Sequence, residues 1–276
     1  MSAMPFPVDR KVQSAIDRLM RAERPFAVAT VIRTLDATAA KPGARALLDA
    51  SGAILAGWIG GGCARSAVAR AVREAIESGQ PRLISLQPEE LLAASGVAAG
   101  EERQGVRFAR NGCPSKGSMD IFVEPVLPRA RLAICGASPV AQALAELSGR
   151  FDFHRTLCTP DTTPEVMPEV DLHRDAFDAP EAGFLVIATQ GKGDMDALRA
   201  AARSQAAYVA FVGSRRKFAT LAAKLAEEGV RRDWLDRVHA PAGLDIKAIT
   251  PEEIALSILA QVIAARRDAD RAGATA

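Results

Sequence analysis

The fold is decided by the stretch Arg131-Leu132-Ala133-Ile134-Cys135-Gly136-Ala137-Ser138-Pro139-Val140-Ala141. Its first half is apolar enough for a buried strand, the glycine permits a tight turn, and a helix to Leu147 is predicted after it. A second strand is predicted at Phe153–Cys158. A strand, a glycine turn, a helix and a further strand are the opening of a Rossmann-like unit.

The rest of the C-terminal half continues this alternation. The segments 185–188 and 208–212 are nearly continuous in apolar residues, as parallel strands covered on both faces require. Thr250-Pro251-Glu252-Glu253 has the capping box and the N1 proline of a last helix, predicted to run to Arg267 before an alanine-rich tail that frays. We therefore expect a Rossmann-like domain with a parallel sheet at 129–276.

The N-terminal half predicts a separate α/β domain at 1–128. Helices are predicted at 8–24 and 64–78, a hairpin around 46–55, and strands at 26–32, 83–86, 105–110 and 119–126. The second helix has clear ends, because Gly79 suits a C′ position and Pro81 forbids continuation. The chain is thus expected to be α/β throughout, in two domains.

Charge and cysteine content narrow the function classes. With 35 basic and 33 acidic residues the net charge is +2, which gives no reason to expect nucleic acid or an anionic membrane as a partner. No apolar run approaches the length of a membrane span and no leader is apparent, so a cytoplasmic location is expected. The four cysteines lack metal-site spacing, so reduced thiols are expected.

The stretch with the most chemical promise is Gly57-Trp58-Ile59-Gly60-Gly61-Gly62-Cys63. Three glycines without Cβ atoms can adopt positive φ and let a ligand approach the main chain. Cys63 lies at the start of the following helix, where free N–H groups and the macrodipole favour an anion such as a thiolate. A tight connection with a small buried cysteine is the alternative. Cys113 lies in a second glycine-containing loop, 111–117.

The dinucleotide fingerprint of the Rossmann half is incomplete. Gly136 and Ala141 occupy its first and third positions, but Ser138 replaces the second glycine. Thr159 stands where an acid would hold a ribose. Ordinary NAD binding is therefore not expected, although Gly136 and Ser138 at a helix N-terminus remain candidates for binding a phosphate of some nucleotide. A Rossmann fold kept only as a scaffold is the alternative.

Several stretches in the same order resemble the XdhC/CoxI family of accessory proteins, which serve xanthine dehydrogenase, carbon monoxide dehydrogenase and related molybdenum hydroxylases. They are 57–63, 112–125, the run Val212-Gly213-Ser214-Arg215-Arg216, and 239–246. The cysteine-and-proline loop makes the CoxF type of the carbon monoxide dehydrogenase branch the most similar.

The resemblance implies a maturation chaperone rather than a turnover enzyme. Such a protein binds the molybdenum cofactor, as molybdopterin or its dinucleotide form, protects it while the metal's sulfur ligand is modified, and delivers it to an apo-hydroxylase. The implied partners are that client and a sulfur donor protein. A second copy of the chain is also expected, because homodimers are the commonest soluble oligomers. The alternatives are a nucleotide-dependent oxidoreductase and a non-catalytic scaffold that grips the client.

On this reading the two loops converge on the cofactor. Gly60, Gly61 and Gly62 supply N–H groups, Cys63 touches the metal or exchanges sulfur, and Cys113 assists. Ser214 and Arg215 are additional candidates, Arg215 for a phosphate and Ser214 as the cap of its helix.

Other polar and sulfur-bearing residues have ordinary explanations. Asp120 and Glu124 are expected to face solvent on a strand, and His239 to be a satisfied loop histidine. Cys135 and Cys158 are expected to be buried as small apolar residues.

Overall fold

The computed structural model describes residues 10–114, 116–160 and 168–274. By its internal contacts the chain divides into two compact units, one of residues 1–128 with 270–276 and one of residues 129–269. Both units combine helices with a sheet, so the α/β class is confirmed. No helix within the described ranges has the length and apolar character that a membrane crossing requires.

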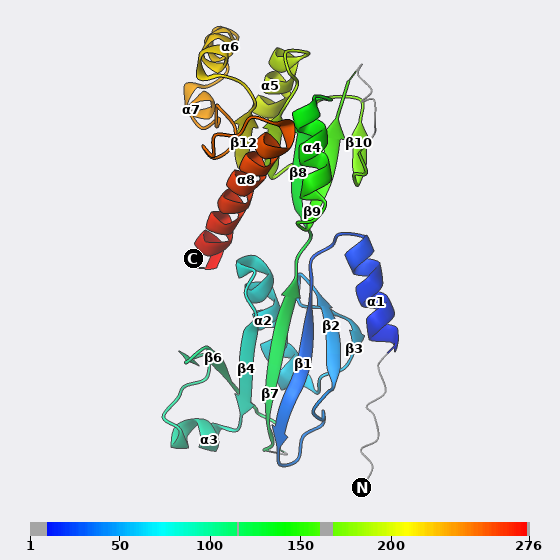
Figure 1. The fold of residues 1–276 in the computed structure, drawn as a ribbon. Coiled ribbons are helices and arrows are strands. Elements are labelled where there is room, and N and C mark those ends of the chain that lie inside the picture. Colours follow the sequence, from blue (N-terminus) through cyan, green and yellow to red (C-terminus); the bar gives the residue numbers. More distant parts are fainter. Residues whose placement is uncertain (1–9, 115, 161–167, 275–276) are drawn as a thin grey trace. The chain divides into compact units, whose positions relative to one another are not determined.

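The first unit is a seven-stranded sheet in the order β3-β2-β1-β7-β4-β6-β5 (Figure 1). Its strands are β1 (Phe26–Leu35), β2 (Arg45–Asp49), β3 (Ile54–Gly57), β4 (Arg82–Gln87), β5 (Glu102–Arg103), β6 (Val106–Arg110) and β7 (Ser118–Val126). Its helices are α1 (Arg10–Arg21), α2 (Gly62–Ser78) and α3 (Glu89–Ala94). Pairing is antiparallel except between β4 and β6.

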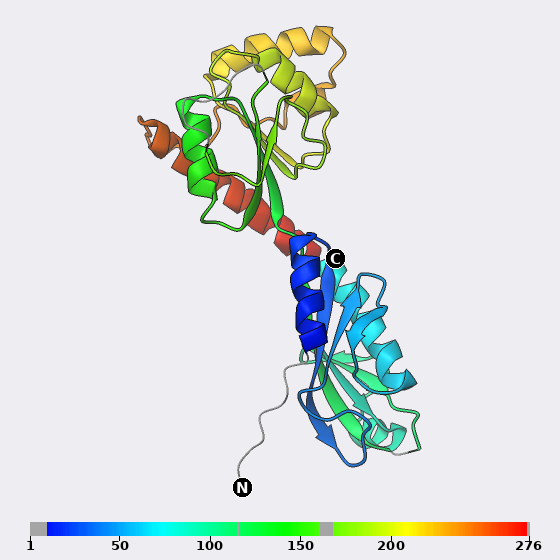
Figure 2. The same cartoon turned by 90° about the vertical axis from the view of Figure 1, so that its right-hand side faces the viewer.

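Helices α1 and α2 cover opposite faces of this sheet (Figure 2). Helix α2 buries Ala64, Val68 and Ala75 at helical spacing against alternate residues of β1, β4 and β7, which form the main core. It ends at Gly79 with a φ of 68°, as predicted. Helix α1 packs on Phe26 and other residues of the opposite parity, and covers only part of its face.

The second unit is a parallel sheet in the order β10-β9-β8-β11-β12, which is the doubly wound arrangement that the sequence predicts. Its elements are β8 (Ala130–Cys135), α4 (Pro139–Ser148), β9 (Phe153–Cys158), β10 (Leu172–Arg174), β11 (Phe184–Ile187), α5 (Asp194–Arg203), β12 (Tyr208–Phe211), α6 (Arg215–Glu227), α7 (Arg232–Leu235) and α8 (Pro251–Ala274). Helices α4 and α8 pack on one face, and α5 and α6 on the other (Figure 2).

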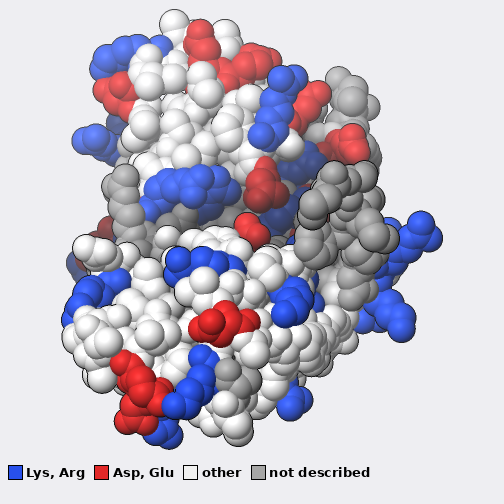
Figure 3. Space-filling view, turned by 90° about the horizontal axis from the view of Figure 1, so that it is seen from below, with Lys and Arg blue, Asp and Glu red and all other residues white. Residues whose placement is uncertain are grey.

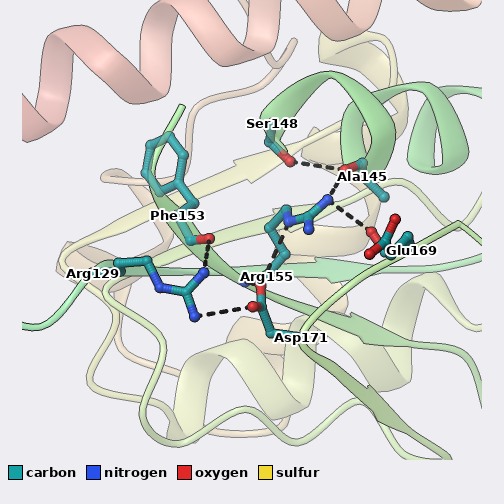
Figure 4. A network of polar contacts seen from close by, with 7 residues as sticks. All are labelled: Arg129, Ala145, Ser148, Phe153, Arg155, Glu169 and Asp171. Atoms are coloured by element: carbon teal, nitrogen blue, oxygen red, sulfur yellow. Dashed lines mark hydrogen bonds and ion pairs between the residues drawn. The ribbon is translucent and has the colours of Figure 1, made fainter. Parts of the chain in front are cut away.

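The sequence did not predict strand β10. Polar contacts of Arg155 hold this strand, and it lacks the apolar pattern by which strands are recognised. The Arg155 guanidinium donates to the carbonyl oxygens of Ala145 at 3.1 Å and Glu169 at 2.7 Å (Figure 4). The backbone N–H of Arg155 donates to Asp171 at 2.9 Å. Arg155 therefore ties helix α4 and strand β9 to the segment that leads into β10.

The sequence predicts the start of the last helix, α8, correctly and its end wrongly. The capping box is confirmed: Thr250 Oγ1 accepts from the N–H of Glu253 at 3.3 Å, and Glu253 accepts from the N–H of Thr250 at 3.0 Å. The prediction that the helix frays after Arg267 is wrong, since α8 continues to Ala274. The segment lacks proline and is rich in good helix formers, so nothing local stops it.

Charged side chains of both signs are interspersed on the face in Figure 3, separated by wide uncharged areas. This mixture of signs is in keeping with the net charge of +2.

Candidate functional site

The glycines between β3 and α2 have two different roles. Gly60 shapes the turn, whereas Gly61 and Gly62 leave the backbone accessible. Gly60 has a φ of 120°, a conformation that other residues rarely adopt. Gly61 has an ordinary φ of −81°, and a Cβ added at Gly61 or Gly62 would meet nothing within 4 Å. Of the three glycines, only Gly60 has the expected positive φ. The backbone at Gly61 and Gly62 borders open space, which we call the glycine cradle.

Helix α2 begins in this cradle without a side-chain cap, because its N-cap residue is Gly61. The N–H groups of its first turn, including those of Gly62 and Cys63, have no acceptor within the helix. They are available to an anionic or polar ligand, and the positive end of the helix dipole favours such a ligand.

The second loop, 111–117, is fixed by Asn111. Its N–H donates to Gln87 O at 2.7 Å, and its side-chain amide donates to Gly117 O at 2.6 Å. Its side-chain oxygen accepts from the N–H of Cys113 at 3.1 Å. A Cβ at Gly117 would lie only 2.3 Å from Ala37 O, so the loop is packed closely against the segment after β1.

The prediction that the two loops converge is confirmed. A Cβ at Gly112 would lie 3.8 Å from Cys63 Sγ. A side-chain hydrogen bond with Cys63, the charge of Cys63 and partial desolvation together raise the pKa of Cys113. Both thiols are free and half-buried. Two neighbouring, half-buried thiols thus make a soft, partly accessible sulfur site.

A groove of about 540 Å³ leads from Cys63 along α2 toward β6. Cys63, Ser66, Arg70 and Glu74 follow one another along the helix side of the groove, which is lined by Gly62, Cys63, Ser66, Ala67, Arg70, Ala71, Glu74, Ile84, Ala99, Gly100, Arg107, Phe108, Ala109 and Arg110. Arg107 is paired with Glu74 at 2.9 Å. Arg70 makes no ion pair within the described part of the chain, so its charge is available to a ligand.

The crevice of the Rossmann unit lies elsewhere, at the point where the strand order reverses between β8 and β11. It measures about 310 Å³ and is lined by Gly136, Ser138, Thr159 and Lys192, among others. Ser138 caps α4 by accepting from Ala141 N at 3.2 Å, and its Oγ donates to Ala188 O at 2.6 Å. Its hydroxyl hydrogen is therefore already used, and phosphate binding by Gly136 and Ser138 stays a prediction.

Sequence reasoning missed a buried carboxylate beside this crevice. Asp194 is 7% exposed and accepts from Thr189 Oγ1 and, at 3.1 Å, from Gly191 N. It also forms an ion pair with Lys217 Nζ at 2.5 Å. Burial alone would raise the pKa of Asp194, but these partners outweigh burial and lower it. The only local signal is an acid in the first turn of a helix after a glycine loop.

The remaining candidates are dispersed. Ser214 caps α6 by accepting from Lys217 N at 3.2 Å, as predicted, and Arg215 is exposed beside it. Cys135 and Cys158 are fully buried, which confirms their assignment to the core.

The two acidic residues of β7, Asp120 and Glu124, and the loop residue His239 differ in their surroundings. Glu124 is exposed, as predicted. The prediction that Asp120 faces solvent is wrong, since its side chain is 15% exposed and bonds to Arg33 and Ser85. The neighbouring strand β4 places Ser85 directly opposite Asp120, a pairing that the order of residues does not reveal. The imidazole of His239 stacks on Tyr208 with ring centroids 4.7 Å apart.

Comparison with known proteins places these features in a family. The XdhC and CoxI family matches residues 19–87, and the XdhC Rossmann domain matches residues 132–262. A curated relative from Escherichia coli strain K12, "Uncharacterized protein YqeB", is 30% identical over 262 residues, which cover 89% of this chain and 44% of the relative. The chain thus spans less than half the length of that relative.

A crystal structure from Bacillus halodurans, described as a xanthine dehydrogenase, aligns with 92% of this chain and 95% of its own, at 18% identity and a TM-score of 0.43. Likeness at that level carries no argument about function. The two family matches fall one in each half of the chain, the first spanning the glycine–cysteine run and the second the Rossmann unit, and on them the chain belongs to the XdhC and CoxI family.

Proposed function

We propose that this protein is a maturation factor that binds the molybdenum cofactor and assists its modification and its insertion into a molybdenum hydroxylase. The observation that carries the proposal is the meeting of Cys63 with Cys113 where Cys63 lines a groove that also holds Arg70, a cation without an ion pair among the described residues. Family membership supports the same role.

The residues fit such a cargo in three respects. The cofactor has a metal with soft sulfur ligands at one end, and thiol sulfur is a ligand type that suits soft metal centres. Its pterin and phosphate need hydrogen-bond donors, which the uncapped N-terminus of α2 offers. The absence of Cβ atoms at Gly61 and Gly62 leaves room for the ligand against the backbone.

The groove also suggests how the cofactor is oriented when it is bound. Arg70 lies two turns after Cys63 on α2, which is roughly 10 Å along the helix axis at 1.5 Å per residue. We therefore place the metal end at the thiol pair and the phosphate at Arg70. With the cofactor bound, Cys63 would contact the metal through its sulfur, Cys113 would hold a proton beside it, and the walls of the groove would shield the bound group from water.

The client and the other partners are part of the proposal. The cysteine-and-proline loop supports a client of the carbon monoxide dehydrogenase type, with a CoxF-like role, over one of the xanthine dehydrogenase type. We propose a sulfur donor protein as a further partner on family grounds, and a second copy of the chain because homodimers are the commonest soluble oligomers.

The test is cofactor retention by the purified protein. Cofactor released anaerobically from a molybdenum enzyme is added, the excess is removed, and bound molybdenum is measured by mass spectrometry and bound pterin by fluorescence after oxidation. The wild type is expected to retain both. Cys63→Ser is expected to lose most of the molybdenum, and Arg70→Gln to bind about tenfold more weakly, as expected for one lost charged hydrogen bond.

Arg73→Gln is the matched control, because Arg73 lies on the same helix but donates to Ser51 O at 3.0 Å and does not line the groove. It is expected to bind like the wild type. Equal retention by Cys63→Ser and the wild type would overturn the role of Cys63. Tight binding of a nicotinamide or flavin nucleotide without molybdenum would favour an oxidoreductase, and client binding without any cofactor would favour a scaffold.

A further inference from the structure

A second hollow in the first unit lies on the sheet face opposite α2. It measures about 210 Å³ and lies where β1, β4 and β7 approach α3, lined by Arg33, Thr34, Leu35, Gln87, Leu91, Ser95, Ser118, Met119 and Asp120. Ile84, Leu86 and Met119 have their side chains in the core beneath α2, so the alternating residues Ser85 and Ser118 belong to the other face. The hollow shares no lining residue with the groove at Cys63.

An ordered chain of hydrogen bonds forms one wall of this hollow. Arg33 Nε and Nη2 both lie 2.6 Å from Asp120 Oδ2, while Ser85 donates to Asp120 Oδ1 at 2.7 Å. Gln87 in turn donates to Ser85 Oγ at 2.9 Å. Both carboxylate oxygens are thus occupied, and their effect is to hold Arg33 in place although its side chain is 63% exposed.

The hollow therefore offers more donors than acceptors. A guanidinium has five N–H groups, and those of Arg33 not directed at Asp120 remain for a ligand. Ser118 is 5% exposed, and its Oγ is buried without a hydrogen-bond partner among the described residues. A buried hydroxyl without a partner is costly, and such a group in a native protein calls for an explanation such as a bound ligand.

Two apolar side chains also line the hollow. Leu35 lies directly across from Ser118 in the register of β1 and β7 and is 51% exposed, and Leu91 of α3 is 43% exposed. An inorganic oxyanion would make no use of them. A ligand with an oxygen-bearing head and a small apolar body would contact both the polar and the apolar side chains.

We infer that this hollow, here called the Arg33 pocket, is a binding site for a small organic carboxylate. The carboxylate accepts hydrogen bonds from Arg33 and Ser118, and the hydrocarbon part lies between Leu35 and Leu91. The volume limits the ligand to roughly a dozen non-hydrogen atoms at most. The inference is independent of the proposed function, because it uses other residues on another face of the sheet.

The experiment is a calorimetric titration of the full chain with benzoate, repeated with benzamide and with inorganic phosphate. Benzoate is expected to bind saturably with a Kd in the millimolar range or below, as suits a ligand of this size. Benzamide, which keeps the ring but lacks the charge, and phosphate, which lacks the ring, are each expected to bind at least tenfold more weakly. Binding by either as strong as that of benzoate would overturn the inference.

Variants locate the site. Arg33→Gln and Ser118→Ala are each expected to weaken benzoate binding about tenfold or more. Arg73→Gln is the control, since Arg73 belongs to the same unit, donates to Ser51 O at 3.0 Å and does not line the pocket. Ser118→Ala is also expected to melt no lower than the wild type without ligand, because it removes an unpartnered hydroxyl. No saturable binding by the wild type, or equal binding by all variants, would refute the site.

Discussion

Replacing Gly136 by alanine should destabilise the second unit strongly, for two separable reasons. Gly136 has a φ of 119°, and a Cβ there would lie 2.6 Å from Ala188 O and 2.7 Å from Thr189 Cα. These atoms are backbone, and Ala188 is held by its N–H bond to Cys135 O at 2.8 Å. The clash therefore cannot be relieved by turning a side chain; β8 and β11 must move apart.

The magnitude follows from adding the two effects. An unfavourable φ at a residue with a side chain costs about 1–3 kcal/mol, and forcing an extra carbon into a packed site costs about 1–3 kcal/mol. We expect a loss of about 2–6 kcal/mol in the free energy of unfolding. For a unit of this size that is a fall in melting temperature of roughly 5–20 °C.

Two other glycines of the same unit separate strain from clash. Gly191 has a φ of 95° but open space around its Cβ position, so Gly191→Ala should show only the strain, about 1–3 kcal/mol. Gly183 has neither problem, since its nearest neighbour would be Arg131 O at 3.8 Å. Gly183→Ala should therefore be within about 1 kcal/mol of the wild type.

Differential scanning calorimetry is the assay, because it can resolve a transition of the second unit from that of the first. Only the second-unit transition should shift in these three variants, which also tests the proposed domains 1–128 and 129–276. The reasoning is refuted if Gly136→Ala melts no lower than Gly191→Ala, since the backbone clash would then have no effect.

Three further predictions concern the anchors of the second unit. Lys217 and the other partners of Asp194 lower its pKa despite burial. The Asp194 carboxylate therefore stabilises the fold above about pH 4, and this contribution is lost as the pH falls through the lowered pKa. Asp194→Asn should make the free energy of unfolding, measured by urea titration, depend less on pH in this acid range. Arg155→Ala should cost about 2–4 kcal/mol in urea unfolding and make amide exchange around β10 faster, while unchanged exchange there would contradict its anchoring role. Glu253→Ala should cost about 1 kcal/mol through the lost capping box, and no change in unfolding free energy would argue against the cap.

Local patterns were sufficient wherever the deciding contacts lie close in sequence. The cap of α4 at Ser138, the end of α2 at Gly79 and the capping box at Thr250 each depend on residues within one or two helical turns of one another. Such features follow from backbone stereochemistry and from the unpaired groups at helix ends, which any window of the sequence contains.

Contacts between distant segments could not be predicted in this way. Asp120 meets Ser85 because of the register between β7 and β4, and Arg155 finds its carbonyl partners across two connections. A one-residue change of register would send Asp120 to the other face. The same limit applies to the thiol pair: each loop was visible as a candidate, but the hydrogen bond between Cys113 and Cys63 needs the folded sheet.

The glycines nevertheless show how structure can separate a functional signal from a structural one. Gly60 and Gly136 are explained by their positive φ, so neither needs a ligand to account for it. Gly62 is the first residue of α2, and nothing would obstruct a side chain there, although alanine is the better helix former. Packing and conformation therefore give no reason for a glycine at this position, whereas a ligand held against the backbone beside Cys63 supplies one. Gly62→Ala should therefore keep or raise the stability of the first unit while weakening cofactor retention.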